Sequence, residues 1–132
     1  MTPAVDGKPN FIEDIFAQLR RAEGRVVLRE IHGTEFASVS GRELLEQVQR
    51  VRGHLRRIGL HPGARCALLA PNSVRWVAFN LALLGEGIIV VPLYARQAPA
   101  ELAVMMKDCL PRFLFTSDRA LGEAVAKELP PQ

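Results

Sequence analysis

The chain has 132 residues, an ordinary length for one domain and long enough to bury a core. Apolar residues make up 48% of it and charged residues 23%, which argues against disorder and low complexity. Lys and Arg exceed Asp and Glu by 17 to 14, a net charge of +3, and there is one Trp and one Tyr. The positive charge is too small, and the aromatic residues too few, for a nucleic-acid binder or an acidic-membrane binder.

The ends and the cysteines indicate a cytoplasmic protein. Residues 1–10 are polar and contain two prolines, so we expect a flexible N-terminus and no signal peptide. The longest apolar stretch, Val77–Leu93, is interrupted by polar residues and two glycines, so we expect no membrane span. Cys66 and Cys109 lack metal-ligand spacing and are interpreted as small buried residues in a reducing cytosol.

The pattern of residues 11–59 predicts a helix, a hairpin and a longer helix. Residues 11–21 carry apolar side chains at helical spacing, and the β-like runs 26–31 and 35–39 surround a turn that contains Gly33. Ser40 and Glu43 have capping-box spacing at the start of the longer helix, which ends at Gly59. Its apolar stripe comprises Leu44, Leu45, Val48, Val51, Leu55 and Ile58.

The opposite face of this helix is rich in arginine. It carries Arg42, Arg50, Arg52, Arg56 and Arg57. A basic cluster can bind phosphate, but Glu46 lies among these residues and the last turns favour positive charge. We therefore predict a solvated helix face.

Strands and helices alternate in the rest of the chain. Strands are predicted at 65–70, 88–91 and 112–116, and helices at 74–84, 100–108 and 119–128. The four β-branched residues 88–91, ended by Pro92, predict a strand buried on both faces. Trp76 is assigned to packing, and Leu102, Met105 and Met106 are expected to face inward. The pattern predicts an α/β fold over residues 1–132: one domain with a layered, mostly parallel sheet flanked by helices, preceded by the helix and hairpin.

Ligands of open α/β sheets bind at the carboxyl ends of the strands, so the loops 70–73, 93–99 and 117–118 are the candidates. None has the glycines of a phosphate loop, and Asn72 or Ser73 is a helix cap. Tyr94, at a strand end, is the candidate substrate-binding residue. No catalytic, cofactor-binding or metal-binding residue is assigned, and no acid or nucleophile is predicted beside the histidines at 32, 54 and 61.

The segments 39–44, 55–73, 83–94, 101–102 and 115–117 occur in the order found in one enzyme family. They resemble the N-terminal region of the AMP-forming acyl-CoA synthetases, which are related to luciferases and to peptide-synthetase adenylation domains. The first segment looks like an early motif of that family, and the stretch from Gly85 to Leu93 looks like the family's second motif. The resemblance covers residues 11–128 and implies the start of the family's AMP-binding domain. Gly41 stands where the first motif usually has tyrosine, which removes an aromatic packing contact.

The resemblance implies an acid–thiol ligase that joins a carboxylate to ATP as an acyl-adenylate and passes the acyl group to coenzyme A. We expect a fatty acyl-CoA synthetase, with ATP, magnesium and coenzyme A as cofactors of the whole enzyme. The family's phosphate loop, nucleotide-binding motifs and catalytic lysine are absent up to Gln132. We therefore expect the 132-residue chain alone to bind none of these cofactors and to be inactive.

The expected partner is the remainder of an adenylating enzyme, since this chain resembles only part of the family's large N-terminal domain. An uncovered sheet edge or apolar face also predicts a homo-oligomer. A second class of function stays open, namely a non-catalytic α/β binding or interaction module derived from the same subdomain. Coenzyme A and a carrier protein are both open as acceptors.

Overall fold

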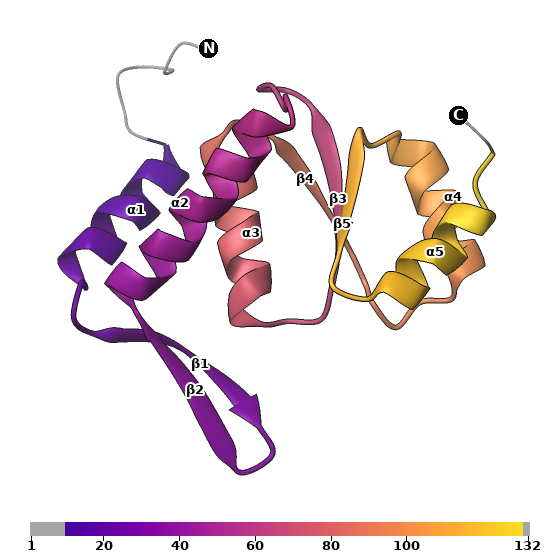
Figure 1. Cartoon of the computed structure of the whole chain (residues 1–132). Helices are drawn as coiled ribbons and strands as arrows, with labels where there is room; N and C mark the ends of the chain where they lie inside the picture. The colour runs from indigo at the N-terminus through magenta and orange to yellow at the C-terminus, as the bar shows by residue number, and fades with distance from the viewer. Residues whose placement is uncertain (1–9, 131–132) are drawn as a thin grey trace.

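The computed structural model describes residues 10–130 and shows an α/β architecture (Figure 1). In chain order the elements are α1 (Phe11–Arg21), β1 (Val26–His32), β2 (Glu35–Ser40), α2 (Gly41–Arg57), β3 (Arg65–Leu69), α3 (Val74–Gly85), β4 (Ile89–Leu93), α4 (Pro99–Cys109), β5 (Phe113–Thr116) and α5 (Arg119–Lys127). Every predicted helix and strand is present. Residues 1–9, most of the predicted flexible N-terminus, lie outside the described part, and the division into domains stays a prediction.

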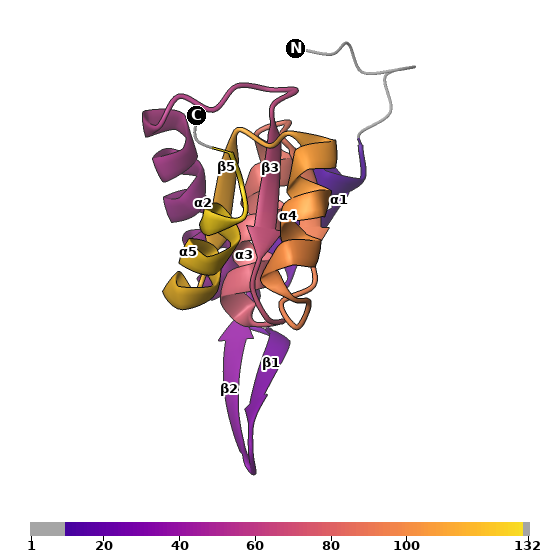
Figure 2. The same cartoon turned by 90° about the vertical axis from the view of Figure 1, so that its right-hand side faces the viewer.

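Three strands form a parallel sheet in the order β4-β3-β5. Helix α3 packs on one face with α1 and α2 beside it, while α4 and α5 cover the other face (Figures 1 and 2). The core divides accordingly, with Leu55 and Leu83 in the first cluster and Leu69, Leu102 and Val125 in the second. The antiparallel pair β1–β2 forms a separate hairpin that projects from the body.

Strand β4 lies at an edge of the sheet. Both of its faces are covered, as predicted, because Val90 packs against the first cluster and Val91 and Leu93 belong to the second, but the burial is only partial. Ile89 keeps 53% of its surface exposed, whereas Leu69 of the central strand β3 is fully buried. A run of β-branched residues predicts a strand, but it does not say how many strand neighbours that strand has. The most buried strand is β3, because it alone has a partner on each side.

Pro92 lies inside β4, opposite Leu68, and does not end the strand as predicted. The amide of Ile89 donates to the Ala64 carbonyl, 2.8 Å away on the β3 side. Backbone groups alternate in direction along a strand, so the nitrogen of Pro92 faces the outer edge. No hydrogen-bond donor is needed there, which is why a proline is tolerated.

Helix caps follow the sequence. Ser40 Oγ accepts from the Glu43 amide at 3.2 Å, and Glu43 Oε1 accepts from the Ser40 amide at 3.1 Å, which completes the predicted capping box. Asp118 caps α5 by accepting a hydrogen bond from the Leu121 amide at 3.0 Å.

On α4 the buried residues include Leu102 and Met106, but Met105 is 38% exposed and Ala103 is buried instead. The predicted inward position of Met105 is therefore wrong.

Gly41 permits a close contact between α1 and α2. A Cβ atom at this position would lie 2.6 Å from the carbonyl oxygen of Ala22 and would also overlap that of Leu19. Both neighbours are backbone atoms at the end of α1, and rigid backbone cannot move aside as a flexible side chain would. The glycine therefore sets the distance between the two helices, where the resemblance indicated only a lost aromatic contact.

The arginine face of α2 is not uniformly solvated, contrary to the prediction. Arg52 donates to Glu86 Oε2 at 2.9 Å and to the Gly85 carbonyl at 3.2 Å, and Arg56 pairs with the same carboxylate. The side chains of Arg52 and Glu86 are only 18% and 12% exposed. The guanidinium carbon of Arg52 also lies 5.5 Å from the centre of the Phe16 ring. This cluster joins α2 to the end of α3, beside the amino ends of β3 and β4.

The two arginines keep the Glu86 carboxylate ionised. Burial alone would raise its pKa, but the hydrogen bonds from Arg56 and Arg52 outweigh burial, so the pKa of Glu86 is lowered. The same hydrogen bond raises the pKa of Arg56. Glu86 is 34 residues from Arg52 in sequence, so local spacing gave no sign of the pair.

Candidate functional site

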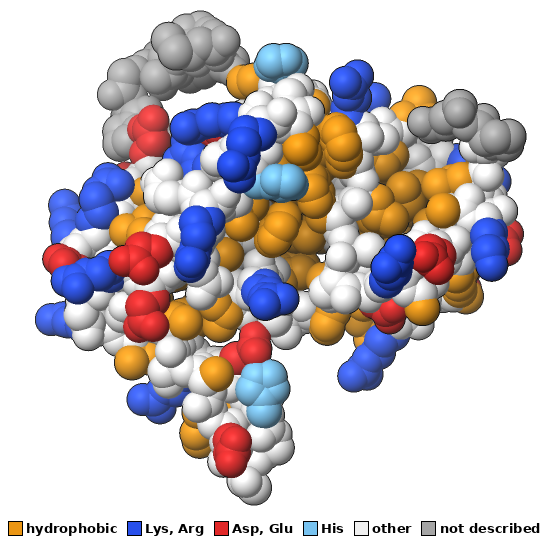
Figure 3. Space-filling model, in the orientation of Figure 1, with side chains coloured by type: hydrophobic (Ala, Val, Ile, Leu, Met, Phe, Trp, Pro, Cys, Tyr) orange, Lys and Arg blue, Asp and Glu red, His pale blue; other side chains and the backbone are white. Residues whose placement is uncertain are grey.

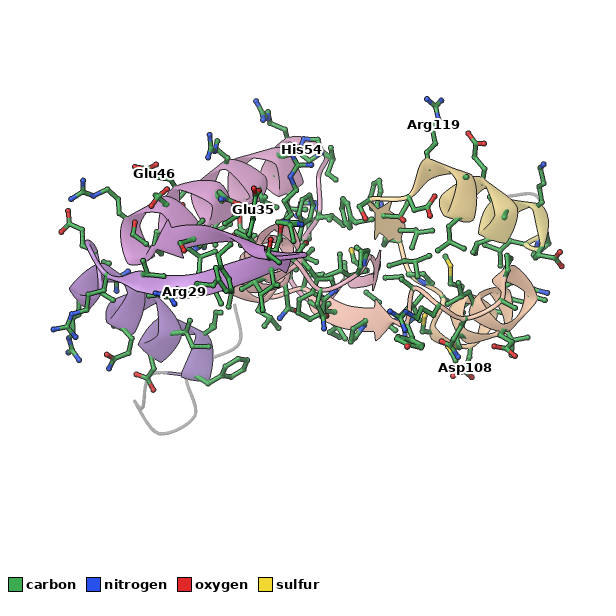
Figure 4. All side chains as sticks on the ribbon, turned by 90° about the horizontal axis from the view of Figure 1, so that it is seen from below. Arg29, Glu35, Glu46, His54, Asp108 and Arg119 are labelled. Carbon is green, nitrogen blue, oxygen red and sulfur yellow. The ribbon has the colours of Figure 1, made fainter. Side chains whose placement is uncertain are left out.

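The three candidate loops come together at the carboxyl ends of β3, β4 and β5, the lower end of the sheet in Figure 1. Parallel strands end at the same side, so the loops after them are neighbours in space. In the view from this end, Asp108 of α4 and Arg119 of α5 project outward from the two helices (Figure 4). The loops border two adjacent hollows.

The first hollow lies between the loop after β3 and the loop after β4. It is lined by Ala70, Pro71, Asn72, Trp76, Pro92, Leu93, Tyr94, Ala95 and Arg96. Tyr94 is 61% exposed and lies on this lining, so the structure places it in a hollow. Its role in substrate binding stays a prediction.

The second hollow lies between α3 and β5 and encloses about 200 Å³. Its lining comprises Leu68, Ala70, Ser73, Arg75, Trp76, Phe79, Phe115, Thr116 and Ser117. The rings of Phe79 and Phe115 are 5.6 Å apart, centre to centre, and make its wall aromatic.

Trp76 borders both hollows, and the sequence reasoning did not identify it or the two lining arginines, Arg75 and Arg96, as site residues. The sequence analysis assigned Trp76 to packing, because it lies in a predominantly apolar helix. The spacing from the N-cap Ser73, whose hydroxyl accepts from the Trp76 amide at 3.0 Å, is the signal that places it near the strand ends.

The chemistry of the two hollows suits a ligand with an apolar body and an anionic group. The walls are aromatic and aliphatic, while Arg96 lies on the first lining and Arg75 on the second. Pockets of this composition gain affinity from apolar burial and direction from a few charged or polar groups. Neither hollow contains a carboxylate or a histidine for acid–base chemistry in its lining.

The amino end of α3 is occupied by protein groups. Oε1 of Glu30, on β1, accepts from the Val74 amide at 2.7 Å and holds the hairpin against α3. Its Oε2 lies 2.6 Å from Nε2 of His32, so the prediction that no acid lies beside the histidines is wrong for His32. The hydrogen bonds from the Val74 amide and from His32 lower the pKa of Glu30. Since Val74 is 44 residues away, no local pattern could reveal this contact.

Side chains already accept hydrogen bonds from several backbone amides at the helix amino ends near the hollows. The amides of Val74 and Trp76 in α3, and of Leu121 in α5, already have side-chain acceptors. Between residues 10 and 130, no three His, Cys, Asp or Glu side chains come close enough to hold a metal ion. In the same range, no helix is both long and apolar enough to cross a membrane.

The comparison with protein families gives a match to the AMP-binding enzymes over residues 15–132. The mitochondrial medium-chain acyl-CoA ligase ACSF2 of Rattus norvegicus is 33% identical over 95 residues, which are 72% of this chain. This chain spans 15% of the length of that ligase.

Solved structures show the same fold. VinN in complex with 3-methylaspartate superposes with a TM-score of 0.77 at 23% identity, over 92% of this chain and 33% of VinN. ATP-bound MatB from Rhodopseudomonas palustris superposes with a TM-score of 0.69 at 24% identity, over 86% of this chain and 22% of MatB. The fold described above is therefore that of one part of these larger proteins.

Proposed function

Because this chain belongs to the family of AMP-binding enzymes, we propose that it forms the N-terminal part of an AMP-forming acid–thiol ligase. The reaction converts a carboxylate, ATP and coenzyme A into acyl-CoA, AMP and diphosphate, and we propose a fatty acid as the carboxylate. The observation that carries this proposal is the family match over residues 15–132, and the 33% identity to a medium-chain acyl-CoA ligase supports the acyl substrate.

Within such a ligase the two hollows would form one wall of the site for the acid or the thiol. Tyr94 and Trp76 supply apolar surface, and Arg75 and Arg96 supply positive charge for an anionic group. These residues bind and orient a substrate and exclude water from it. The linings contain no carboxylate or histidine to act as a general acid or base, so we assign no catalytic residue in this chain.

ATP, magnesium and coenzyme A are the proposed cofactors of the whole enzyme, and ATP supplies the adenylyl group when bound. The loops of this chain lack the glycines of a phosphate loop, and the amides of Val74 and Trp76 in α3 and of Leu121 in α5 are already engaged by side chains, so the residues present do not fit the triphosphate. We therefore propose that other parts of the protein hold the nucleotide, and that the 132 residues alone are inactive. The remainder of the enzyme is then this chain's principal partner.

We also propose a cytoplasmic location. Cys66 is fully buried and Cys109 partly so, and both are free thiols. Burial raises the pKa of the Cys66 thiol, which keeps it protonated and unreactive. Two unpaired cysteines are what a reducing compartment allows.

The test is acid-dependent ATP–pyrophosphate exchange by the protein encoded by the complete reading frame that contains these residues. Fatty acids of several lengths are compared with amino acids, because VinN was solved with an amino acid. We expect exchange with a fatty acid and none with the 132-residue chain alone. Exchange only with amino acids would contradict the acyl substrate. No exchange by the complete protein would contradict the ligase and favour the non-catalytic binding module.

A further inference from the structure

A residue of the hairpin holds the amino end of α3. In the described part of the chain, the backbone of residues 70–72, which leads into this helix, forms no backbone hydrogen bond outside the helices and strands. The first amides of a helix have no acceptor within it, and here the Ser73 hydroxyl accepts from the Trp76 amide at 3.0 Å. Oε1 of Glu30 accepts from the Val74 amide at 2.7 Å. Ser73 moves with the helix that it caps, so of these two contacts only the one from Glu30 ties the end of α3 to another element.

The Glu30 carboxylate is fixed at both of its oxygens. Its Oε2 lies 2.6 Å from Nε2 of His32, and residues two apart in a strand point to the same face. The pair lies on the hairpin, where Figure 3 shows acidic and histidine side chains together. The Glu30 side chain is 25% exposed, whereas that of His32 is 62% exposed. The carboxylate is therefore partly buried and directed at α3.

The contact made by Glu30 adjoins the candidate site. A third hollow, of about 660 Å³, lies between the hairpin, α2 and α3, and Glu30 is on its lining. Ser73, Arg75 and Phe79 line both this hollow and the second one. After the hydrogen bonds from Val74 and His32, the charge of Arg75 also lowers the pKa of Glu30, so the two charges are close. The first turn of α3 thus has the hairpin on one side and the candidate site on the other.

We propose that Glu30 is a positioning residue, which fixes the first turn of α3 and thereby sets where Arg75 and Trp76 lie on the linings of the first two hollows. The inference rests on the proposed function, in which those hollows form part of the site for the acid or the thiol. Glu30 is on neither of their linings, so it acts through α3 and not by touching the substrate. A binding group that is free to move binds its ligand less well than one held in place.

The first measurement is the accessibility of Trp76, the one tryptophan among the 132 residues, to acrylamide, which quenches its fluorescence. We expect Glu30→Ala to raise the quenching constant about twofold, because the first turn of α3 then opens more often. Glu30→Gln keeps an oxygen that can accept from the Val74 amide, so its quenching should match that of the unsubstituted chain. Glu35→Ala, which changes an exposed glutamate on the same hairpin, is the matched control. Circular dichroism verifies folding, and His32→Ala, which removes only the contact at Oε2, takes the place of Glu30→Ala if that variant does not fold.

The second measurement is the kinetics of thioester formation by the protein encoded by the complete reading frame. We expect Glu30→Ala to raise the KM of the acid or of coenzyme A about tenfold and to leave kcat unchanged, because binding is weakened and the chemical step is not. Glu30→Gln should restore KM. Glu86→Ala breaks the ion pairs at the opposite end of the sheet, so it controls for a general loss of stability and should leave both KM values unchanged.

Equal quenching in Glu30→Ala and in the unsubstituted chain would overturn the inference, whatever the kinetics show. Stronger quenching with no change in either KM would also overturn it, since the end of α3 would then move without affecting binding. A rise in KM as large in Glu86→Ala as in Glu30→Ala would overturn it too, because lost stability would explain both. If the complete protein forms no thioester, the proposed function fails, and the quenching still decides whether Glu30 positions α3.

Discussion

The two ends of the parallel sheet are built in different ways. At the amino end, Glu86 is held by Arg52 and Arg56, and its side chain is only 12% exposed. At the carboxyl end, Tyr94 is 61% exposed and borders a hollow with Trp76. One end is closed by ion pairs between elements distant in sequence, and the other presents aromatic side chains to the solvent.

The difference leads to a prediction of how charged residues divide between stability and ligand binding in this chain. The arginines of α2 nearest the sheet are used to join helices, because a carboxylate from the end of α3 meets them there. Arg75 and Arg96 instead lie on the linings of the hollows. Substitutions at the amino end should therefore change stability, and substitutions at the carboxyl end should change ligand binding.

Among substitutions at the amino end, the largest effect is expected from Glu86→Ala. Loss of the carboxylate leaves Arg52 partly buried without its partner, so the free energy of unfolding should fall by about 2 kcal/mol. Urea unfolding followed by circular dichroism measures the change. The control is Glu46→Ala on the exposed face of α2, which should stay within about 0.5 kcal/mol. Equal losses in both variants would show that the amino end is not held by this ion pair.

A smaller loss is expected from Arg52→Lys. Lysine keeps the charge but cannot donate from several nitrogens to Glu86 and to the Gly85 carbonyl, so the free energy of unfolding should fall by about 1 kcal/mol. Arg56→Lys provides the comparison, because the Arg56 side chain is 62% exposed and its pair is more fully solvated. A larger loss of unfolding free energy in Arg56→Lys than in Arg52→Lys would contradict the assignment of Arg52 as the more important of the two arginines.

Acid should weaken the amino end. The pKa of Glu86 is lowered in the folded protein, so its ionised form adds stability above the usual carboxyl value of 4.5, and this stability is lost as the pH falls through the folded pKa. The pKa of Glu30 is lowered as well, so its ionised form also adds stability that is lost in acid. The urea concentration at the midpoint of unfolding should fall as the pH is lowered from about 7 to about 3. In Glu86→Gln this decrease with pH should be smaller. An unchanged slope in Glu86→Gln would contradict this assignment.

The smallest change in stability is expected at the carboxyl end. Tyr94→Ala removes a largely exposed ring, so the free energy of unfolding should change by less than about 0.5 kcal/mol. Leu93→Ala, one residue earlier and 7% exposed, should by contrast cost about 2–3 kcal/mol. If Tyr94→Ala were as costly as Leu93→Ala, the tyrosine would be a packing residue and not a ligand contact.

Local spacing predicted the elements well. The capping box of Ser40 and Glu43 and the left-handed Gly59, with φ of +78°, fix the ends of α2 through contacts within a few residues. The rule that ligands meet parallel sheets at their carboxyl ends pointed to Tyr94, which lies on the lining of a hollow there, and its role in substrate binding stays a prediction. Such features depend on neighbours in the sequence, so the sequence alone displays them.

The features that the sequence did not predict depend on residues far apart in the chain. The edge position of β4 follows from the strand order, and the pairs Arg52–Glu86 and Glu30–Val74 join segments more than 30 residues apart. Trp76 becomes part of the candidate site only when the loops after β3, β4 and β5 meet. Hydrophobic periodicity predicts which face of a helix or strand is buried. It does not predict which other element packs against that face.

The most direct test of the account is the effect of Tyr94→Ala on the protein encoded by the complete reading frame. The kcat/KM for thioester formation is measured beside that of Phe36→Ala, a variant of a similarly exposed aromatic residue on the hairpin. We predict that Tyr94→Ala lowers kcat/KM about tenfold through KM, while Phe36→Ala leaves it unchanged. Unchanged kinetics in Tyr94→Ala, or an equal loss in both variants, would contradict the claim that the carboxyl end of this sheet is the functional face.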